Sequence, residues 1–470
     1  MTQSTNAASA GAAAERWEST RRVLDASPTA FHAGEEIARR LREAGFTELA
    51  ERERWQLQAG KSYFVRRDLG AVIAFRSGSG EPAETGAVIA GAHTDSPALK
   101  LKIESEKGVD GLVTMATEIY GGPILSTWLD RDLEIAGRAS LRAGAGGGSR
   151  GGGGSGAAGG VESRLVRLEG LRAVIPNVAI HLNRKVNEGF EYNKQEHLRC
   201  ILGRVDGEGD SDAAAGESAS DAGAGYLRRQ VAAELGVAAE DILGLDLFLA
   251  DSAPAALLTR SGAPQLYASR HIDNLAGCST TLDALLESEV TPWTQVAVFF
   301  DNEEIGSRSH AGAQSGFLDR ILDRLVLASG GSHEDTFRLR ARSFLLSNDG
   351  AHGAHPNFHD KYDAAYLPRL GGGPVLKSHA GLSYTSVAES TAWFRRACEE
   401  GGVPHQVYAN RSDGRSGSTI GPLIQTRSDL RSVDVGLPML AMHSVREIGD
   451  VTDLELMTRA IAGLYRLGPG

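Results

Sequence analysis

The chain is 470 residues long and carries a net charge of −11, with 41% apolar and 23% charged residues. This length allows two or three domains around a large buried core, and the composition is that of an ordinary globular protein. The acidic balance argues against nucleic acid and against an anionic membrane as the main partner.

The N-terminal segment Met1–Ala14 is polar and rich in alanine, and it lacks the basic region and apolar core of a signal peptide, so we expect a disordered tail. No apolar run approaches the ~18 residues that span a bilayer. Cys200, Cys278 and Cys398 are far apart and form no CxxC motif, which argues against disulfides and a cysteine-zinc site. We therefore expect a cytoplasmic protein that binds no membrane.

Helical and strand patterns follow one another in the first hundred residues. A helix is expected over Glu15–Gly45, interrupted at Ser27–His32. Its second half places Ile37, Leu41 and Ala44 on one face at helical spacing. The next apolar segments predict strands at Tyr63–Val65, Ala71–Phe75 and Ala87–Ala90.

Two segments of low complexity lie in the middle of the chain. Ala143–Gly160 is nearly all Gly, Ala and Ser, and Asp206–Gly225 adds acidic residues to that composition. Such segments bury too little apolar surface to offset their ordering entropy, so we expect two mobile loops. Leu165–Leu168 and Ala179–Leu182, which lie between them, predict strands.

These patterns divide the chain into a discontinuous α/β domain, residues 1–94 and 237–470, and a strand-rich insert, residues 95–236. Strands are expected in the last half at Leu245–Phe248, Val296–Phe300, Ser343–Ser347 and Met439–Met442. The chain closes with a helix for which Thr452–Glu455 is the predicted capping box. Its apolar face consists of Leu454, Met457, Ile461 and Leu464.

Two adjacent carboxylates, Glu303 and Glu304, follow the apolar run Val296–Phe300. The run predicts a buried strand, and open α/β sheets bind ligands at the carboxyl ends of their strands. Two neighbouring Glu side chains repel each other there unless a cation or a shared proton separates their roles. A two-metal hydrolase separates them, since one Glu ligates metal and the other takes a proton from the attacking water. For an isolated pair, an acidic solvated turn is the alternative.

Further motifs carry side chains suited to a divalent metal. His93 and Asp95 are two residues apart at a predicted strand end, so Asp95 can steady the ring of His93. Asp273 is able to bridge two metals, although an Asp in this setting also caps helices. Asp349 and His443 each follow an apolar run that predicts a buried strand.

Together these side chains predict a site for two zinc ions per subunit. If Asp273 bridges the ions, His93 and Asp349 complete one set of ligands, and Glu304 and His443 complete the other. Each ion then has three protein ligands and an open position, which is the pattern of a catalytic site. Nitrogen and oxygen ligands without cysteine also suit cobalt or manganese.

The metal-binding residues belong to motifs that are spread over nearly the whole chain outside the two low-complexity segments. The motifs are Ser27–His32, Gly91–Pro97, Thr127–Leu133, Ile180–Arg184, His271–Leu275, Asp301–Ser307, His352 with His355–Asn357, Thr419–Pro422 and Met442–Glu447. In this combination the chain resembles the aspartyl aminopeptidases, which belong to the co-catalytic zinc aminopeptidases.

The resemblance implies a zinc-peptidase-like three-layer α/β/α domain with an inserted dimerisation domain. Dimers of such subunits would assemble into a tetrahedral dodecamer. Glu303 would be the general base and Glu304 a metal ligand, with Asp95 among the catalytic residues. His181, in the insert, would reach the active site of the neighbouring subunit and stabilise the reacting carbonyl.

The resemblance also implies a substrate pocket formed by His352, Lys377 and Tyr384, and removal of an N-terminal residue, preferably Asp or Glu, from peptides. His379 and Ser383 stand where the family usually has Asn and Arg. This difference leaves open an aminopeptidase of neutral residues or a deacylase on the same two-metal site. A non-catalytic assembly or cargo-binding protein is a further alternative, but such a protein should have lost a ligand or the base.

Overall fold

The structure, a computed structural model, describes residues 2–145, 160–205, 223–259 and 265–470. It divides into two compact units, residues 1–96 with 254–470, and residues 97–253. The second unit runs past the expected boundary at 236 because β12 (Ile242–Asp251) pairs with β9 (Leu133–Arg142). The segments predicted to be mobile loops lie for the most part outside the described residues.

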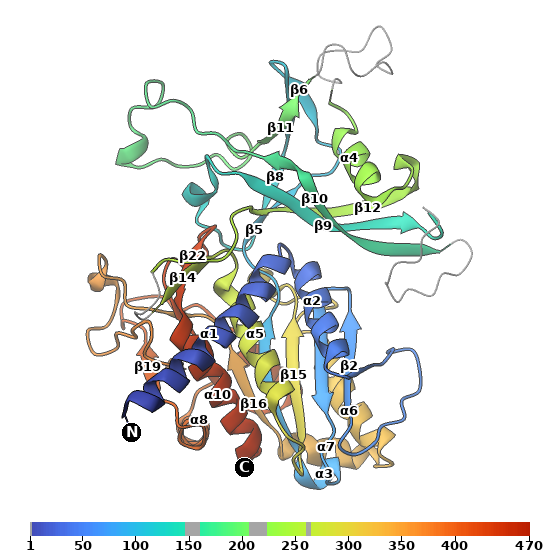
Figure 1. Ribbon diagram of the computed structural model, residues 1–470, viewed down its shortest axis with the longest axis vertical. Coiled ribbons are helices and arrows are strands. Elements are labelled where there is room, and N and C mark those ends of the chain that lie inside the picture. Colours follow the sequence, from blue (N-terminus) through green and yellow to red (C-terminus); the bar gives the residue numbers. More distant parts are fainter. Residues whose placement is uncertain (1, 146–159, 206–222, 260–264) are drawn as a thin grey trace. The chain divides into compact units, whose positions relative to one another are not determined.

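A nine-stranded mixed sheet forms the middle layer of the first unit (Figure 1). Across the sheet, its strands are β1 (Thr47–Glu48), β2 (Ser62–Arg67), β3 (Ala71–Arg76), β15 (Thr294–Phe300), β4 (Ala87–His93), β16 (Phe344–Asn348), β20 (Arg431–Gly436), β18 (Val375–Ser378) and β19 (Gln406–Ala409). The neighbours β15, β4 and β16 are parallel, so their carboxyl ends lie at one edge of the sheet. The predicted strands at Tyr63–Val65, Ala71–Phe75 and Ala87–Ala90 are confirmed.

Alternating side chains of the sheet build two separate cores, one on each face. In β3, Val72 and Ala74 belong to the first core, whereas Ile73 and Phe75 belong to the second. The helices that cover the first face are α1 (Thr2–Ala26), α2 (Ala30–Glu43), α5 (Ile272–Glu287), α8 (Ala388–Gly401) and α10 (Val451–Leu467). The second face packs against α6 (Phe317–Ala328), α7 (His333–Ala341) and α9 (Ile420–Ser428), with α3 (Pro82–Thr85) beside α6 and α7. This is the expected three-layer α/β/α arrangement.

The N-terminal segment is helical, so the expectation of a disordered tail is wrong. Helix α1 begins at Thr2 because its alanine-rich sequence has high helix propensity and continues into a segment that packs. Trp17, Val23 and Leu24 of this helix are buried in the first core. The predicted interruption is confirmed, since α1 ends at Ala26 and α2 begins at Ala30. Within the described part of the chain, we find no helix whose length and apolarity would let it cross a bilayer.

The C-terminal helix α10 has the predicted apolar face but a different N-terminus. The side chain of Asp450, and not that of Thr452, caps the helix by accepting a hydrogen bond of 2.7 Å from the backbone N–H of Thr452. Asp450 can do so because it ends β22 (Glu447–Asp450), which leads directly into the helix. The four residues of the predicted face are fully buried: Leu454, Met457, Ile461 and Leu464.

The second unit is built from antiparallel sheets. Its five-stranded sheet has the order β10 (Val161–Ala173), β9, β12, β5 (Ala98–Leu101) and β8 (Thr117–Tyr120). A three-stranded sheet contains β11 (Cys200–Arg204), β7 (Leu112–Met115) and β6 (Lys107–Val109), and α4 (Tyr226–Leu235) packs against β10. The predicted strand at Leu165–Leu168 is confirmed within β10. The one at Ala179–Leu182 is wrong, because the N–H of Leu182 bonds to the carbonyl of Ala179 and closes a turn.

Candidate metal centre and active site

Three of the predicted metal-binding residues lie at the carboxyl edge of adjacent parallel strands. His93 is the last residue of β4, and Asp349 directly follows β16. Glu304 lies in the short 3-10 helix Glu303–Ile305, which follows β15. Since β15, β4 and β16 are neighbours, their ends bring together residues that are far apart in sequence.

The other two predicted ligands come from segments outside the sheet. Asp273 lies in the first turn of α5, where its dihedral angles depart from helical values and its bond to Asn274 is cis. His443 lies in the loop after β21 (Pro438–Met439). The strand expected at Met439–Met442 therefore ends at Met439. Ala441 and His443 adopt left-handed conformations, with φ of 57° and 67°, which a strand does not accommodate.

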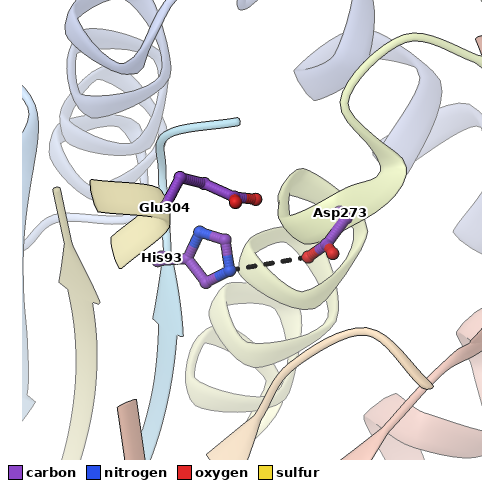
Figure 2. Close-up of side chains that lie close together, drawn as sticks. All are labelled: His93, Asp273 and Glu304. Atoms are coloured by element: carbon purple, nitrogen blue, oxygen red, sulfur yellow. Dashed lines mark ion pairs between the residues drawn. The ribbon is translucent and has the colours of Figure 1, made fainter. Parts of the chain in front are cut away.

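The two imidazoles contact opposite oxygens of Asp273. Nε2 of His93 lies 3.5 Å from Oδ1 of Asp273 and 3.6 Å from Oδ1 of Asp349. Nε2 of His443 lies 3.6 Å from Oδ2 of Asp273 and 3.4 Å from Oε1 of Glu304. Figure 2 shows the side chains of His93, Asp273 and Glu304 close together, with a dashed line for the ion pair between His93 and Asp273. Each His thus shares Asp273 and has one further carboxylate of its own.

The carboxylates raise the pKa of both imidazoles. Burial alone would lower the pKa of His93, but Asp273 and Asp349 outweigh it and raise the pKa well above its usual value. For His443 burial also lowers the pKa, and Asp273 and Glu304 raise it to about 10. Positive charge is therefore strongly favoured between these carboxylates.

The pKa values of the two adjacent glutamates are also raised, which for a carboxyl group favours the neutral form. Burial, together with the neighbouring carboxylates, raises the pKa of Glu303 to about 8. The pKa of Glu304 is raised well above its usual value, first by burial and then by the charge of Asp273. More negative charge is gathered here than the two imidazoles neutralise, and a divalent cation would relieve it.

The donor set fits such cations. His93, Asp273 and Glu304 each offer a ligand atom, and these atoms lie within 4.8 Å of one another. Oδ1 of Asp273 is buried and has no hydrogen-bond donor among the described residues, so it remains available to a metal. Imidazole and carboxylate groups without a thiolate match zinc, and also cobalt or manganese.

Asp95 orients the glutamates more directly than it orients His93. Its two carboxylate oxygens accept hydrogen bonds from the backbone N–H groups of Glu303, at 3.0 Å, and Glu304, at 3.1 Å. Nδ1 of His93 lies 3.0 Å from the backbone carbonyl of Asp95 and 3.4 Å from its carboxylate. The expected contact with His93 is present, but the main partners of the side chain are in the turn after β15.

Glu447 is a site residue for which the sequence predicted no role. Its side chain is buried, and its two oxygens accept hydrogen bonds from the backbone N–H groups of Asp273, at 2.9 Å, and His443, at 2.7 Å. One carboxylate therefore fixes the backbones of two predicted ligands. Asn348, the last residue of β16, is a second such residue. Its backbone carbonyl accepts a hydrogen bond of 2.8 Å from the side chain of Asn274, and its side-chain amide donates one of 3.1 Å to the carbonyl of Gly277 in α5. In the sequence, Asn348 directly precedes the predicted ligand Asp349, and Glu447 follows His443 by four residues. This proximity is the sequence feature that could have pointed to them.

The predicted substrate residues lie near one another in the first unit. Lys377, on β18, is 3% exposed, and its Nζ lies 5.4 Å from the centre of the Tyr384 ring. The ring of His352 packs edge-on against Tyr408, which contacts the same apolar cluster as Tyr384. Burial lowers the pKa of His352, and the positive charge of Lys377 lowers it further.

Three further residues that the sequence singled out are His379, Ser383 and His181. His379 lies beside Tyr384, with ring centres 6.3 Å apart, and the backbone N–H of Ser383 points to Nδ1 of His379 at 3.5 Å. Asp434 anchors this loop by accepting a hydrogen bond of 2.6 Å from the N–H of Thr385. His181 lies in the second unit, on the exposed turn after β10.

Comparison with known proteins identifies the family. The family described as aminopeptidase I zinc metalloprotease (M18) matches residues 23–465. The chain belongs to the M18 family. Aspartyl aminopeptidases are members of M18, so the resemblance carried by the sequence motifs is confirmed. The chain is accordingly a zinc metalloprotease of the aminopeptidase class, a hydrolase.

Similar proteins cover almost the full length of this M18 chain. A probable M18 family aminopeptidase 2 from Clostridium novyi is 39% identical over 94% of this chain and 96% of its own. The chain of a solved complex of Ape4 and Nbr1 is 30% identical, with a TM-score of 0.86, and the match covers 98% of this chain and 86% of that one. The S. cerevisiae mApe1 dodecamer, 24% identical with a TM-score of 0.76, shares the fold over 96% of both chains.

Proposed function

We propose that this M18 aminopeptidase removes an N-terminal Asp or Glu from peptides, with two zinc ions per subunit. The observation that carries the specificity is Lys377. Its ammonium group is almost fully buried, and it forms no hydrogen bond or ion pair with any described residue. Burial lowers the pKa of Lys377, but the charges of Asp349 and Asp434 contribute to raising it above its usual value. The carboxylate of an acidic substrate residue would supply the direct hydrogen-bonding partner that the ammonium group lacks.

In this proposal, each predicted ligand has one role. His93 and Asp349 hold one ion, Glu304 and His443 hold the other, and Asp273 is shared, which the distances of 3.4–3.6 Å support. Bound zinc would polarise the scissile carbonyl and lower the pKa of the attacking water.

Glu303 is the proposed general base. It would take a proton from the attacking water and deliver it to the departing amine. The positions of the two glutamates support this role. Asp95 fixes the backbone of both, but among the described residues it is Glu304, and not Glu303, that pairs with His443. The acidic side chains around the site would bind the free α-amino group of the peptide, which accounts for action at the N-terminus.

We further propose that the chain assembles into dimers, and the dimers into a tetrahedral dodecamer. The S. cerevisiae relative is described as a dodecamer, and the turn around His181 supports association. Val178 is 54% exposed, Ile180 47% and Leu182 80%. Clustered apolar side chains of this kind are typical of interaction surfaces. In a dimer, His181 would complete the site of the other subunit.

The specificity is tested by Lys377→Ala. We expect kcat/KM to fall for peptides that begin with Asp or Glu by roughly tenfold to more than a hundredfold, because the variant loses a charge-assisted hydrogen bond worth about 1.5–3 kcal/mol. Peptides that begin with Leu or Ala should be affected much less. Lys361→Ala is the matched control, since the side chain of Lys361 is 71% exposed.

A neutral-residue aminopeptidase or a deacylase is the second candidate, favoured by His379 and Ser383 in place of the family's usual Asn and Arg. Steady-state specificity on peptides that begin with Asp, Glu, Leu or Lys, and on N-acyl amino acids, separates the candidates. Equal losses on all peptides in Lys377→Ala would show that Lys377 is structural.

A further inference from the structure

A cavity of about 290 Å³ lies beside the predicted metal ligands in the first unit. Its walls come from the loop after β17 (Ala351–His352) and from the segment that joins β21 to β22. The cavity shares His352 with the proposed substrate residues, but neither Lys377 nor Tyr384 is among its described lining residues. The lining residues are His352, His355, Tyr362, Met439, Leu440, Ala441, Met442 and His443.

The walls of this cavity are mainly apolar. Met439, Leu440 and Met442 contribute aliphatic and thioether groups, and Tyr362 contributes an aromatic ring. The hydroxyl of Tyr362 already donates a hydrogen bond of 2.7 Å to the carbonyl of Gly353. Flexible methionines adapt to ligands of different shape. The volume is at the lower end for ligand pockets, about 300–1,000 Å³, and thus suits one side chain rather than a whole molecule.

Backbone hydrogen bonds preform the cavity. The N–H of Gly353 donates to the carbonyl of Met439, and Leu440 exchanges two hydrogen bonds with Ile448 of β22. Between these fixed points, Ala441 and His443 are both left-handed without being glycine. Residues held in such conformations cluster at ligand-binding and catalytic sites.

The cavity adjoins the predicted reaction centre at His443. This residue lines the cavity, and its Nε2 lies 3.4 Å from Glu304. A peptide that is cleaved after its first residue needs space on both sides of the scissile bond. In the proposed function the first side chain lies beside Lys377 and Tyr384, which leaves the apolar cavity for the second.

We propose that this cavity binds the side chain of the second residue of the peptide and favours an apolar or aromatic one. The proposal rests on the aminopeptidase activity and on the proposed placement of the first side chain beside Lys377. It makes the enzyme selective at two positions, with an acidic residue first and a leucine-like or phenylalanine-like residue second.

Two peptide series on the metal-loaded enzyme test it. The first, Xaa-Ala-Gly, varies the N-terminal residue and identifies the best one, which tests the proposed function by itself. The second keeps that residue and varies the next one among Ala, Leu, Phe, Lys and Asp. We expect kcat/KM for Leu and Phe to exceed that for Ala by at least about tenfold, since even one methylene in an apolar pocket contributes a factor of 10–200. Equal values across the second series would overturn the proposal, whatever the first series shows.

Leu440→Ala tests whether the cavity causes the selectivity at the second position of the peptide. We expect it to reduce the ratio of kcat/KM for Leu over Ala at the second position while the ratio for Asp over Leu at the first position is kept. Leu327→Ala is the matched control, because Leu327 is 50% exposed near the end of α6. If Leu440→Ala instead alters selectivity at the first position, the cavity binds the N-terminal side chain and the proposal is wrong.

Discussion

At the scale of single residues, Glu303 and Glu304 are adjacent but differ in their partners. Among the described residues, Glu304 forms an ion pair with His443, at 3.4 Å, and Glu303 forms none. We expect Glu303→Gln to lower kcat by about 10²–10⁴-fold, because it removes a proton acceptor and not a ligand. Two zinc ions per subunit should remain bound, as measured by plasma mass spectrometry. Loss of half of the zinc would identify Glu303 as a ligand instead.

Glu447 gives a prediction about metal affinity. Both of its oxygens accept N–H groups, from Asp273 and His443, and an amide offers only one acceptor. Glu447→Gln therefore places an NH2 group against an N–H and should displace a ligand backbone. We expect zinc affinity, measured by competition with a chelator, to fall by about 10–100-fold, the usual effect of residues that orient metal ligands.

Activity at saturating zinc separates a role of Glu447 in positioning the ligands from a role in general stability. Saturating zinc should restore most of the activity of Glu447→Gln if the residue positions the ligands, whereas a loss that excess zinc does not reverse would contradict this. Glu389→Gln serves as the control, since the side chain of Glu389 is 75% exposed.

The structure brings the five predicted ligands together, and four of them stood out in the sequence because each follows closely on an apolar run that predicts a buried strand. The hydrogen-bond partners of Asp95 and Glu447 could not be predicted from the sequence. Asp95 bonds to a backbone N–H 208 residues away, and Glu447 to one 174 residues away. A backbone donor leaves no trace in residue type, so such contacts depend on the fold itself.

At the scale of elements, Asp246 joins three strands of the second unit. On β12, its carboxylate accepts hydrogen bonds from Lys100 of β5, at 2.8 Å, and from Arg138 of β9, at 2.9 Å. Burial would raise the pKa of Asp246, but the two cations outweigh it and lower the pKa. The ionised form therefore stabilises the folded sheet.

We expect Asp246→Asn to reduce the free energy of unfolding by about 1 kcal/mol at pH 7, a small value because the three side chains are partly exposed. The lowered pKa places this stabilisation above the unfolded value of about 3.9 and removes it as the pH falls through the folded-state pKa. Urea unfolding at pH 7 and below pH 4 checks it, with the exposed Glu169→Gln as control. A difference between wild type and Asp246→Asn that persists at low pH would contradict the electrostatic account.

The elements differ in how well sequence predicted them. Strands such as Val296–Phe300 are continuous apolar runs buried on both faces, and their pattern is unambiguous. Three of the four residues of Ala179–Leu182 are also apolar, yet this segment forms a turn in which Ile180 and Leu182 are exposed in the single chain. Composition cannot separate a strand from an apolar surface segment. Thr2–Ala14 is helical although its polar composition is typical of a tail, because its many alanines have high helix propensity.

At the scale of the whole molecule, the proposed docking of the exposed turn on a second copy would link oligomerisation to catalysis. His181 lies among Val178, Ile180 and Leu182, of which the last is 80% exposed. If this turn docks on a second copy, His181 would act there as a preorganised donor toward developing negative charge. Removal of such a donor typically costs ~10²–10³-fold in rate. Activity would then depend on the dimer and not on the folded subunit alone.

We therefore expect His181→Ala to be nearly inactive while its fold, measured by circular dichroism, and its zinc content are unchanged. Mixing it with Glu303→Gln subunits should restore part of the activity, because one site of a mixed dimer receives both a competent base and a competent His. Each variant incubated with itself is the control. Subunit exchange is verified with differently labelled chains. If exchange occurs and no activity returns, His181 does not act across the interface and serves only its own subunit.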